Sequence, residues 1–253
     1  MSTATALQPE RLHSIAADPA TASVPASNLT QHTGQITLDE RVGLFRHRPV
    51  TLWLTGLSAT GKSTLAYALE KRLLEAGHAC VVLDGDNLRH GLNRDLGFTP
   101  ADRTENIRRV AEVARLFNDA GLLVVTAFIS PYRADREQAR AVIGEARFVE
   151  AFVDTPLDEC ERRDPKGLYA KARAGKLPEF TGVSAPYEPP ATPELRLDTV
   201  RFSAEELVET AMGALSSRAT FARARAGLSI LPGGAKAGSG RAATGKRHRS
   251  TRT

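Results

Sequence analysis

Cysteine is scarce in this chain, which has only Cys80 and Cys160 among its 253 residues. Cys80 opens an apolar strand pattern and Cys160 lies in a helical pattern, so the pair indicates neither a disulfide framework nor a metal cluster. No apolar run is long enough to span a bilayer, and no basic head followed by an apolar stretch marks a secretory signal. We therefore expect a cytoplasmic protein that does not enter a membrane.

Acidic residues are absent from residues 218–253, where nine lysines and arginines occur. The formal net charge of the chain is +5, so removing those nine positive charges leaves about −4 for the remainder. The basic character belongs to this C-terminal segment, which we predict to be a disordered tail. Such a tail favours salt-sensitive binding of nucleic acid. It has no pattern of interleaved aromatic residues, however, and we interpret it first as a solvated segment.

The rest of the chain divides into a leader and one domain. Residues 1–34 are rich in Ala, Ser, Thr and Pro without periodicity, which predicts a disordered leader. Over residues 35–217, short apolar runs alternate with helical patterns, which indicates an α/β fold with a mainly parallel sheet and helices on both faces. The predicted strands cover 50–56, 80–84, 122–129 and 147–154, and the predicted helices cover 36–46, 62–76, 99–121, 133–146, 156–163 and 203–215.

Two segments of the domain differ in how strongly they predict structure. Residues 99–121 predict a long helix, because Thr99 can cap it, Pro100 suits its first turn and Asp102 completes a capping box. Residues 164–193 are rich in Gly, Pro, Lys and Arg, and we expect them to form a mobile excursion.

A phosphate-binding sequence lies between the first predicted strand and the helix that follows it. The stretch "GLSATGKST" (56–64) fits the pattern G-x-x-x-x-G-K-[ST], and this strand–loop–helix context is what the pattern requires. Backbone N–H groups of residues 58–63 are expected to cradle phosphates at the helix N-terminus. Lys62 is expected to reach the β- and γ-phosphates, and the Ser63 hydroxyl to bind Mg²⁺. The expected ATP-binding residues are Gly56, Ser58, Ala59, Thr60, Gly61, Lys62, Ser63 and Thr64.

The second predicted strand ends in "VVLDGDNLRHGLN" (81–93), where carboxylates surround a glycine and a cation follows. In phosphoryl transfer, a carboxylate near the acceptor hydroxyl orients it and takes its proton. Asp84 and Asp86 are therefore candidates for the acceptor side, facing the phosphates from the neighbouring strand, and Arg89 for an anionic part of the acceptor. From this segment alone, a plain polar turn between strand and helix is an equally good interpretation.

Several further segments resemble one family when they are taken together and in order. These are "LDGDNLRHGLNRDLGF", "DRTENIRRVAEVARL", "AFISPYRADR", "RDPKGLYAKARAG" and "FTGVSAPYEPP". Together with the phosphate-binding sequence 56–64 (the P-loop), these segments extend the resemblance to the adenylylsulfate kinases over about residues 35–215. It implies a three-layer P-loop nucleoside triphosphate hydrolase-like fold. It also implies transfer of the γ-phosphate of MgATP to the 3′-hydroxyl of adenosine 5′-phosphosulfate (APS), giving ADP and 3′-phosphoadenosine 5′-phosphosulfate (PAPS) in sulfate assimilation.

The resemblance also implies roles for residues outside the P-loop. Phe98 and Phe180 are expected to sandwich the adenine of APS, and Arg103 and Asn106 to bind its phosphosulfate or ribose. A lid over about 163–182 is expected to close over both nucleotides. Taken alone, the two phenylalanines could be core residues and Arg103 and Asn106 solvated helix residues. The full expected APS site is Asp84, Asp86, Asn87, Leu88, Arg89, Phe98, Arg103, Asn106, Ile129, Ser130, Lys166 and Phe180.

Ser130 matches the serine that the family assigns to a phosphoserine intermediate, and Asp86, Lys62 and Ser130 are the expected catalytic residues. No histidine lies beside Ser130 in sequence to activate it, so direct in-line transfer with a binding role for Ser130 is the favoured chemistry. The P-loop departs from the family, which usually has glycine and then a small residue where this chain has Ala59 and Thr60. If that position needs a positive φ, Ala59 strains the loop.

The resemblance further implies a homodimer that works downstream of an ATP sulfurylase, with that enzyme not fused to this chain. Two other hypotheses stay open. One is a P-loop kinase with a sugar or another nucleotide as acceptor, against which Phe98, Phe180 and the acceptor segments argue. The other is a nucleic-acid-binding or scaffolding protein that uses the basic tail; removal of residues 218–253 distinguishes it, because only nucleic-acid binding depends on the tail.

Overall fold

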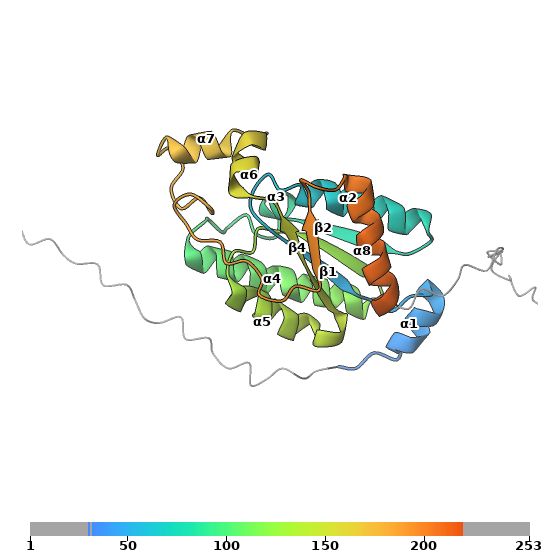
Figure 1. Ribbon diagram of the computed structural model, residues 1–253. Coiled ribbons are helices and arrows are strands. Elements are labelled where there is room, and N and C mark those ends of the chain that lie inside the picture. The colour runs from blue at the N-terminus through green and yellow to red at the C-terminus, as the bar shows by residue number, and fades with distance from the viewer. Residues whose placement is uncertain (1–29, 31, 220–253) are drawn as a thin grey trace, which may run out of the picture. The chain divides into compact units, whose positions relative to one another are not determined.

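The computed structural model describes residue 30 and residues 32–219. Most of the predicted leader and of the predicted basic tail therefore lies outside the described residues. Helices and strands alternate along the described chain (Figure 1). They are α1 (Leu38–Phe45), β1 (Thr51–Thr55), α2 (Lys62–Glu75), β2 (Cys80–Asp84), α3 (Gly85–Arg89), α4 (Pro100–Asp119), β3 (Leu123–Ala127), α5 (Arg133–Ile143), the 3₁₀ helix η1 (Glu145–Arg147), β4 (Phe148–Asp154), α6 (Leu157–Arg163), α7 (Leu168–Arg173), β5 (Leu195–Asp198) and α8 (Ala204–Ala219).

The strands form one parallel sheet in the order β2-β3-β1-β4-β5. The predicted α/β architecture is confirmed. One detail of the prediction is wrong: β2 does not neighbour β1, because β3 pairs with both and lies between them. Since all strands are parallel, the loops that follow β1, β2 and β3 still meet at the same edge of the sheet.

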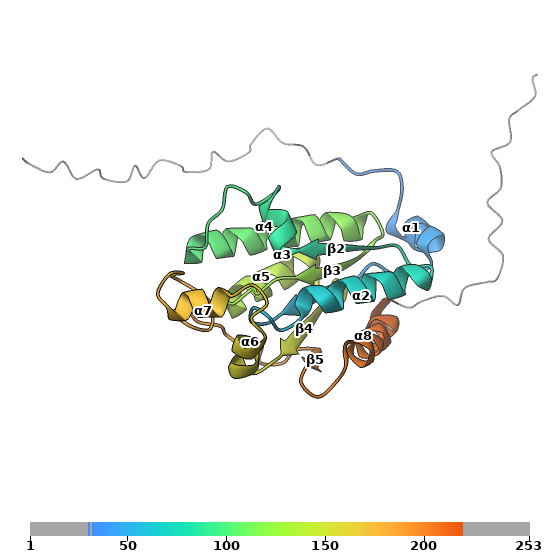
Figure 2. The same cartoon turned by 90° about the horizontal axis from the view of Figure 1, so that it is seen from above.

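Two apolar clusters cover the two faces of this sheet. Alternation along a strand sends Leu52 and Leu54 to one face and Trp53 to the other. On the first face α2 and α8 pack through Leu69, Leu73 and Leu215, among other residues. On the second face α4 and α5 pack through residues such as Ile107, Val110, Ala139 and Ile143. In Figure 1, α2 lies above the strands and α4 and α5 lie below them, and in Figure 2, seen from above, α2 lies in front of the strands, which completes the three layers.

The local signals for α4 are confirmed in detail. The hydroxyl of Thr99 accepts the backbone N–H of Asp102, the Asp102 carboxylate accepts the N–H of Thr99, and Pro100 occupies the first turn. Both orphan donors at the helix start are thereby satisfied. This cap fixes where α4 begins, and it sets the positions of Arg103 and Asn106 in the first two turns.

The structure departs from the sequence prediction after residue 127 and near the end of the domain. Residues 128–131 leave the sheet as a turn instead of extending β3 to residue 129. Helix α7 and strand β5 lie within or next to the segment predicted as an excursion. Helix α8 runs to Ala219, two residues beyond the predicted domain end. The carbonyl of Ala219 accepts the N–H of Arg48 at 2.7 Å, which ties this last turn to the entry of β1.

Within the described residues, no helix combines the length and apolar character needed to cross a membrane.

Candidate active site

The loop between β1 and α2 begins and ends at glycines that the backbone requires. Gly56 has φ 153°, and a Cβ there would lie 2.7 Å from the carbonyl oxygen of Val153 on β4. Gly61 has φ 95° and forms the N-cap of α2. The predicted P-loop therefore lies between β1 and the N-terminus of α2, where N–H groups and the helix dipole favour phosphate.

Lys62 is buried at the start of α2 and its ammonium group turns back over the loop. Nζ donates to the carbonyl oxygen of Gly56 at 2.8 Å, to that of Leu57, and to the Thr60 hydroxyl. Burial lowers the pKa of Lys62 to about 8, against the raising effects of nearby Cys160, Asp84 and Asp86. The amine is thus held inside the loop by weak acceptors that phosphate oxygens can replace.

Ala59 adopts the left-handed conformation, with φ 61°. The condition raised by the sequence is therefore met: the position where the family usually has glycine does need a positive φ in this chain. An L-residue with a Cβ is strained there. The methyl group also packs against the apolar cluster around Tyr169 and Phe180, which offsets part of the strain.

Asp84 joins the P-loop to the predicted acceptor segment. Its Oδ2 accepts the Ser63 hydroxyl at 2.7 Å, and its Oδ1 accepts the N–H groups of Asp86 and Asn87. Asp84 is thereby the N-cap of the short helix α3. Its contacts place it beside the Ser63 hydroxyl, so it reaches the phosphate side although β3 separates β2 from β1.

One cavity of about 910 Å³ collects most of the predicted site residues. Its lining includes Ser58, Ala59, Gly61, Lys62, Ser63, Thr64, Asp84, Asp86, Arg89, Phe98, Arg103, Asn106, Ile129, Ser130, Lys166 and Phe180. In the described part of the chain, four predicted residues do not line it: Gly56, Thr60, Asn87 and Leu88. Thr60 is buried beneath the loop, Asn87 donates to the Tyr67 hydroxyl, and Leu88 packs against the core below α4.

Asp86 projects from α3 into the cavity and pairs with Lys166 of the predicted lid. Both side chains are well exposed, so this ion pair adds little to the stability of the fold. The predicted lid residues from Arg163 to Thr181 supply ten of the cavity-lining side chains. The Asp86–Lys166 pair therefore joins the lid to the opposite wall across the cavity.

Arg103 connects the segments that carry the two phenylalanines. Its guanidinium donates to the carbonyl oxygen of Phe98, to the Thr181 hydroxyl and to the carbonyl oxygen of Glu179. Burial lowers the pKa of Arg103. The interpretation of Arg103 as a solvated helix residue is wrong, because it is 9% exposed and its donors reach from α4 to the lid.

Phe98 and Phe180 lie in different environments. Phe98 is exposed, and the Arg89 guanidinium lies 4.2 Å from its ring centroid while donating to the carbonyl oxygens of Leu96 and Gly97. Phe180 is buried with its ring edge-on to Tyr169, at 5.0 Å between centroids. Arg89 thus supports the loop before α4, a role that the sequence did not indicate.

Asn106 is buried and is held by a second amide. The Asn93 side-chain N–H donates to the Asn106 Oδ1 at 2.9 Å. The interpretation of Asn106 as a solvated residue is also wrong. Asn106 lines the cavity, and the bond from Asn93 holds it there.

Ser130 lies in the turn after β3 and is almost fully buried. Its φ is 39°, and its Oγ accepts the indole N–H of Trp53 at 3.2 Å. An indole N–H can donate but cannot accept a proton, so this contact does not activate the hydroxyl as a nucleophile.

Sequence reasoning missed residues whose role depends on contacts far along the chain. The Tyr169 hydroxyl donates to the carbonyl oxygen of Ser58 in the P-loop. Tyr187 shares a hydrogen bond with Thr55 at the end of β1. Both tyrosines occur in segments that carried the family resemblance, which is the signal that could have marked them; the contacts themselves span more than 100 residues.

Comparison with known proteins decides the family. The family model for adenylylsulphate kinase matches residues 48–198, which is more than half of the chain. This chain belongs to the adenylylsulphate kinase family. An adenylyl-sulfate kinase from Geotalea uraniireducens is 55% identical over 181 residues, which cover 72% of this chain and 87% of that protein.

A solved structure supports the same family and the P-loop kinase fold. The APS kinase CysC of Mycobacterium tuberculosis, solved with AMPPNP and APS, is 53% identical, with a TM-score of 0.65. The match covers 67% of this chain and 98% of that one. The bifunctional enzyme NodQ of Azospirillum brasilense is 60% identical over 184 residues, and this chain spans only 30% of its length.

Proposed function

We propose that this member of the adenylylsulphate kinase family transfers the γ-phosphate of ATP to the 3′-hydroxyl of APS, giving PAPS and ADP. The observation that carries the proposal is the single cavity that the P-loop shares with the acceptor segments. Lys62 and Ser63 line it from one side, and Asp86, Phe98 and Arg103 from the other. A donor and an acceptor can therefore meet inside it without leaving the protein.

The P-loop and Lys62 form the ATP side of the proposed mechanism. Phosphates at the N-terminus of α2 meet backbone N–H groups and the positive end of the helix dipole. The Lys62 ammonium exchanges its carbonyl partners for phosphate oxygens. Burial lowers the pKa of Lys62, and the negative charge of the phosphates raises it again, which keeps the side chain protonated. Lys62 then stabilises charge on the transferring group in a buried setting, where such contacts are strong.

The residues near Ser63 fit a nucleotide-bound Mg²⁺. The Ser63 hydroxyl and the Asp84 carboxylate supply oxygens, which Mg²⁺ prefers, and they already lie in contact. Among the residues that the structure describes, no group of three or more His, Cys, Asp or Glu could hold a metal ion by itself. Phosphates must therefore supply further ligands, as is usual for this ion. When bound, Mg²⁺ neutralises charge on the β- and γ-phosphates.

The acceptor side orients the hydroxyl and excludes water. Asp86, which pairs with Lys166 in this structure, is proposed to accept the proton of the 3′-hydroxyl once Lys166 leaves it for the anionic group of APS. Phe98 and Phe180 present aromatic surface for the adenine. Asn87 and Leu88 contribute by shaping α3, since neither lines the cavity. Closure of segment 163–182 completes a site from which water is excluded.

Direct transfer is the favoured chemistry. A phosphoserine intermediate requires a base for Ser130, whereas the contact of its Oγ is with the Trp53 N–H. In-line transfer requires only that the two substrates are held in register. Ser130 is thus proposed to bind and orient APS.

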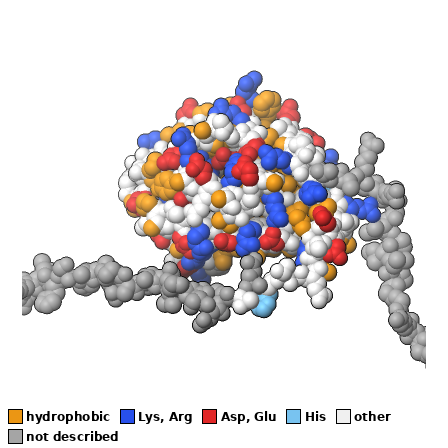
Figure 3. Space-filling view, turned by 90° about the horizontal axis from the view of Figure 1, so that it is seen from below, with side chains coloured by type: hydrophobic (Ala, Val, Ile, Leu, Met, Phe, Trp, Pro, Cys, Tyr) orange, Lys and Arg blue, Asp and Glu red, His pale blue; other side chains and the backbone are white. Residues whose placement is uncertain are grey.

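The wider setting of the reaction is part of the proposal. We place it in the cytoplasm, downstream of an ATP sulfurylase, with the enzyme as a homodimer. On the face shown in Figure 3, basic and acidic side chains are interspersed, which does not favour nucleic acid as a partner of that face. Residues 220–253 of the predicted basic tail (218–253) lie outside the described residues.

The first test is ADP release in the presence of Mg²⁺, measured with APS, with AMP and with ATP alone. Turnover only with APS is expected. Asp86→Ala is expected to lower kcat by about 100-fold or more, because a positioned base contributes roughly 10²–10⁴-fold. Ser130→Ala is expected to keep measurable turnover.

Asp95→Ala is the matched control for Asp86, since Asp95 is an exposed carboxylate in the same region that pairs with Arg109. It is expected to behave like the wild type. ATP binding without any APS-dependent turnover would reject the proposed acceptor. Complete loss of turnover in a folded Ser130→Ala protein would restore the phosphoserine route.

A further inference from the structure

We propose that Arg136, paired with Glu150, is a positioning residue that holds the Ser130 turn in the shape that the acceptor site requires. Arg136 touches neither the cavity nor any residue of the P-loop motif, so it acts only through the turn. The inference rests on the proposed function, because the turn contributes Ile129, Ser130 and Pro131 to the acceptor side of the cavity.

The turn needs to be held. Ser130 has φ 39°, which lies outside the regions that a residue with a Cβ prefers. Such a conformation costs on the order of 1–3 kcal/mol and persists only when the surroundings determine it. Ser130 is 2% exposed, so protein contacts and not solvent must hold it.

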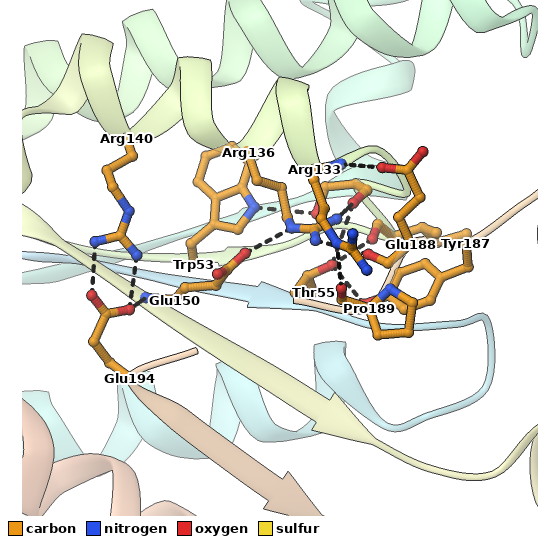
Figure 4. A network of polar contacts seen from close by, with 12 residues as sticks. Trp53, Thr55, Arg133, Arg136, Arg140, Glu150, Tyr187, Glu188, Pro189 and Glu194 are labelled. Carbon is orange, nitrogen blue, oxygen red and sulfur yellow. Dashed lines mark hydrogen bonds and ion pairs between the residues drawn. The ribbon is translucent and has the colours of Figure 1, made fainter. Parts of the chain in front are cut away.

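Arg136 uses all three nitrogens of its guanidinium group to hold the turn and the segments around it. Nη1 donates to the carbonyl oxygen of Ser130 at 2.7 Å, and Nη2 donates to the carbonyl oxygen of Glu188 at 2.8 Å. Nε donates to the Glu150 carboxylate on β4 at 2.7 Å. Figure 4 shows Arg136 at the centre of this network, between Glu150 and the segment with Tyr187 and Glu188. A planar fork can make these three bonds at once, whereas the single ammonium of a lysine cannot make them in the same geometry.

Glu150 compensates for the burial of the positive charge of Arg136. The Arg136 side chain is 3% exposed and that of Glu150 is 13% exposed. A buried guanidinium without a counter-charge is strongly unfavourable, and a carboxylate at hydrogen-bond distance compensates for it. Glu150 therefore fixes the direction of Arg136, and Arg136 fixes the peptide after Ser130.

The same turn is held from two other elements. From β1, Thr55 donates to the carbonyl oxygen of Ile129 and Trp53 donates to the Ser130 Oγ. From the segment after the lid, the N–H of Glu188 donates to the carbonyl oxygen of Pro131. Arg136 links the Ser130 carbonyl both to Glu150 on the sheet and to the Glu188 carbonyl of the post-lid segment, so its loss removes these links and leaves the turn held by the bonds from β1 and from the Glu188 N–H.

The test compares Arg136→Met with Arg140→Met, one turn further along α5. Arg140, whose side chain is 20% exposed, pairs bidentately with Glu194 but makes no bond to the turn, so it reproduces the loss of an ion-paired arginine of α5 without the positioning role. For Arg136→Met we expect kcat/KM for APS to fall roughly 10- to 100-fold, the scale of a misplaced reacting group. The Kd for ATP is expected to stay within about twofold of wild type, because no bond joins Arg136 to the P-loop. For Arg140→Met both constants are expected to stay within about twofold.

Arg136→Lys provides the conservative variant and is expected to recover part of the loss, since one of the three bonds can form. The inference is overturned if folded Arg136→Met retains wild-type kcat and KM for APS. It is equally overturned if Arg140→Met loses APS turnover to the same extent, or if ATP binding falls in parallel with APS turnover.

Intrinsic tryptophan fluorescence tests the positioning role of Arg136 independently of the proposed reaction. Trp53 is the only tryptophan of the chain, and its N–H bonds to Ser130, so its emission reports on the turn without any substrate. Arg136→Met is expected to shift the emission maximum of the ligand-free protein in the direction that Ser130→Ala shifts it, and Arg140→Met to leave it unchanged. If wild type shows no APS turnover but the shift occurs, the proposed function fails and the positioning role stands. An unchanged emission in Arg136→Met overturns the positioning role.

Discussion

The backbone strain at Ala59 is expected to have a measurable effect on the free energy of unfolding. Its methyl group occupies a left-handed backbone position in the P-loop, where glycine has no steric penalty. We expect Ala59→Gly to raise the free energy of unfolding by about 0.5–1 kcal/mol, because relief of the strain outweighs the added freedom of the unfolded chain. Urea denaturation measures the change.

Ala68→Gly is the matched control, because Ala68 lies inside α2 and is only partly buried. It is expected to destabilise the protein by roughly 1 kcal/mol. A loss of stability in Ala59→Gly as well would mean that the packing of the methyl group near Tyr169 and Phe180 outweighs the strain.

At the residue scale, the sequence predicts what local pattern determines. Lys62 and Ser63 lie where the motif predicts them, because the loop, its glycines and the helix start are contiguous. The bracing role of Arg103 and the contact between Trp53 and Ser130 are not local: their partners lie 78 and 77 residues away. Pattern alone assigns such residues to a helix or strand and says nothing of the partner that gives them a role.

The cap of helix α4 is expected to stabilise both the protein and the first helical turn, which contributes Arg103 to the proposed acceptor site. Thr99→Ala removes the hydroxyl that accepts the N–H of Asp102, and we expect a loss of about 1 kcal/mol in unfolding free energy. The first turn carries Arg103, so fraying is expected to raise KM for APS more than the KM for ATP. Steady-state kinetics together with urea denaturation test both expectations.

Thr99→Ser keeps the hydroxyl acceptor and is expected to retain wild-type stability and KM values. If Thr99→Ala raises both KM values equally, the effect of the cap is general and not directed to the acceptor side.

At the element scale, predictability follows length and periodicity. Helix α4 has 20 residues, a clear apolar stripe and a complete capping signal, and it is predicted almost to the residue. Helix α7 has six residues and β5 four, too few for periodicity to emerge from a segment rich in Gly, Pro and Lys. These short elements exist because Tyr169 and Leu197 find buried partners on the rest of the domain.

At the scale of the whole molecule, two buried histidines lie at the amino ends of the strands, opposite the candidate active site, and are expected to make stability depend on pH. His47 and His78 are buried next to one another, before β1 and β2, with 3.3 Å between their Nδ1 atoms. Burial lowers the pKa of both, and for His47 the neighbouring His78 lowers it further.

Stability is therefore expected to fall on acidification. The unfolded chain takes up protons on these histidines near pH 6.5 and the folded chain does so only at lower pH, so the stabilisation is complete above pH 6.5 and is lost below it. The loss at pH 5.5 is at most about 1.4 kcal/mol per histidine. Urea midpoints at pH 7.5 and 5.5 measure it.

Two variants assign this effect. His78→Asn is expected to reduce the difference between the two midpoints, whereas His90→Asn, at an exposed position, is expected to leave it unchanged. Equal midpoints at both pH values in the wild type would contradict the expectation. Because the pair lies far from the carboxyl ends of the strands, kcat at saturating substrate should not follow the same profile.

The strand order also sets a length. The donor loop follows β1, the acceptor carboxylates follow β2, and β3 separates them. Adjacent strands lie about 4.8 Å apart, so the two anchoring points are separated by roughly 10 Å. Side chains bridge this separation, since the Asp84 carboxylate at the end of β2 accepts the Ser63 hydroxyl of α2 at 2.7 Å. The middle strand therefore spaces the two backbone segments by about two strand widths, and the side chains above its end bring their polar groups back into contact.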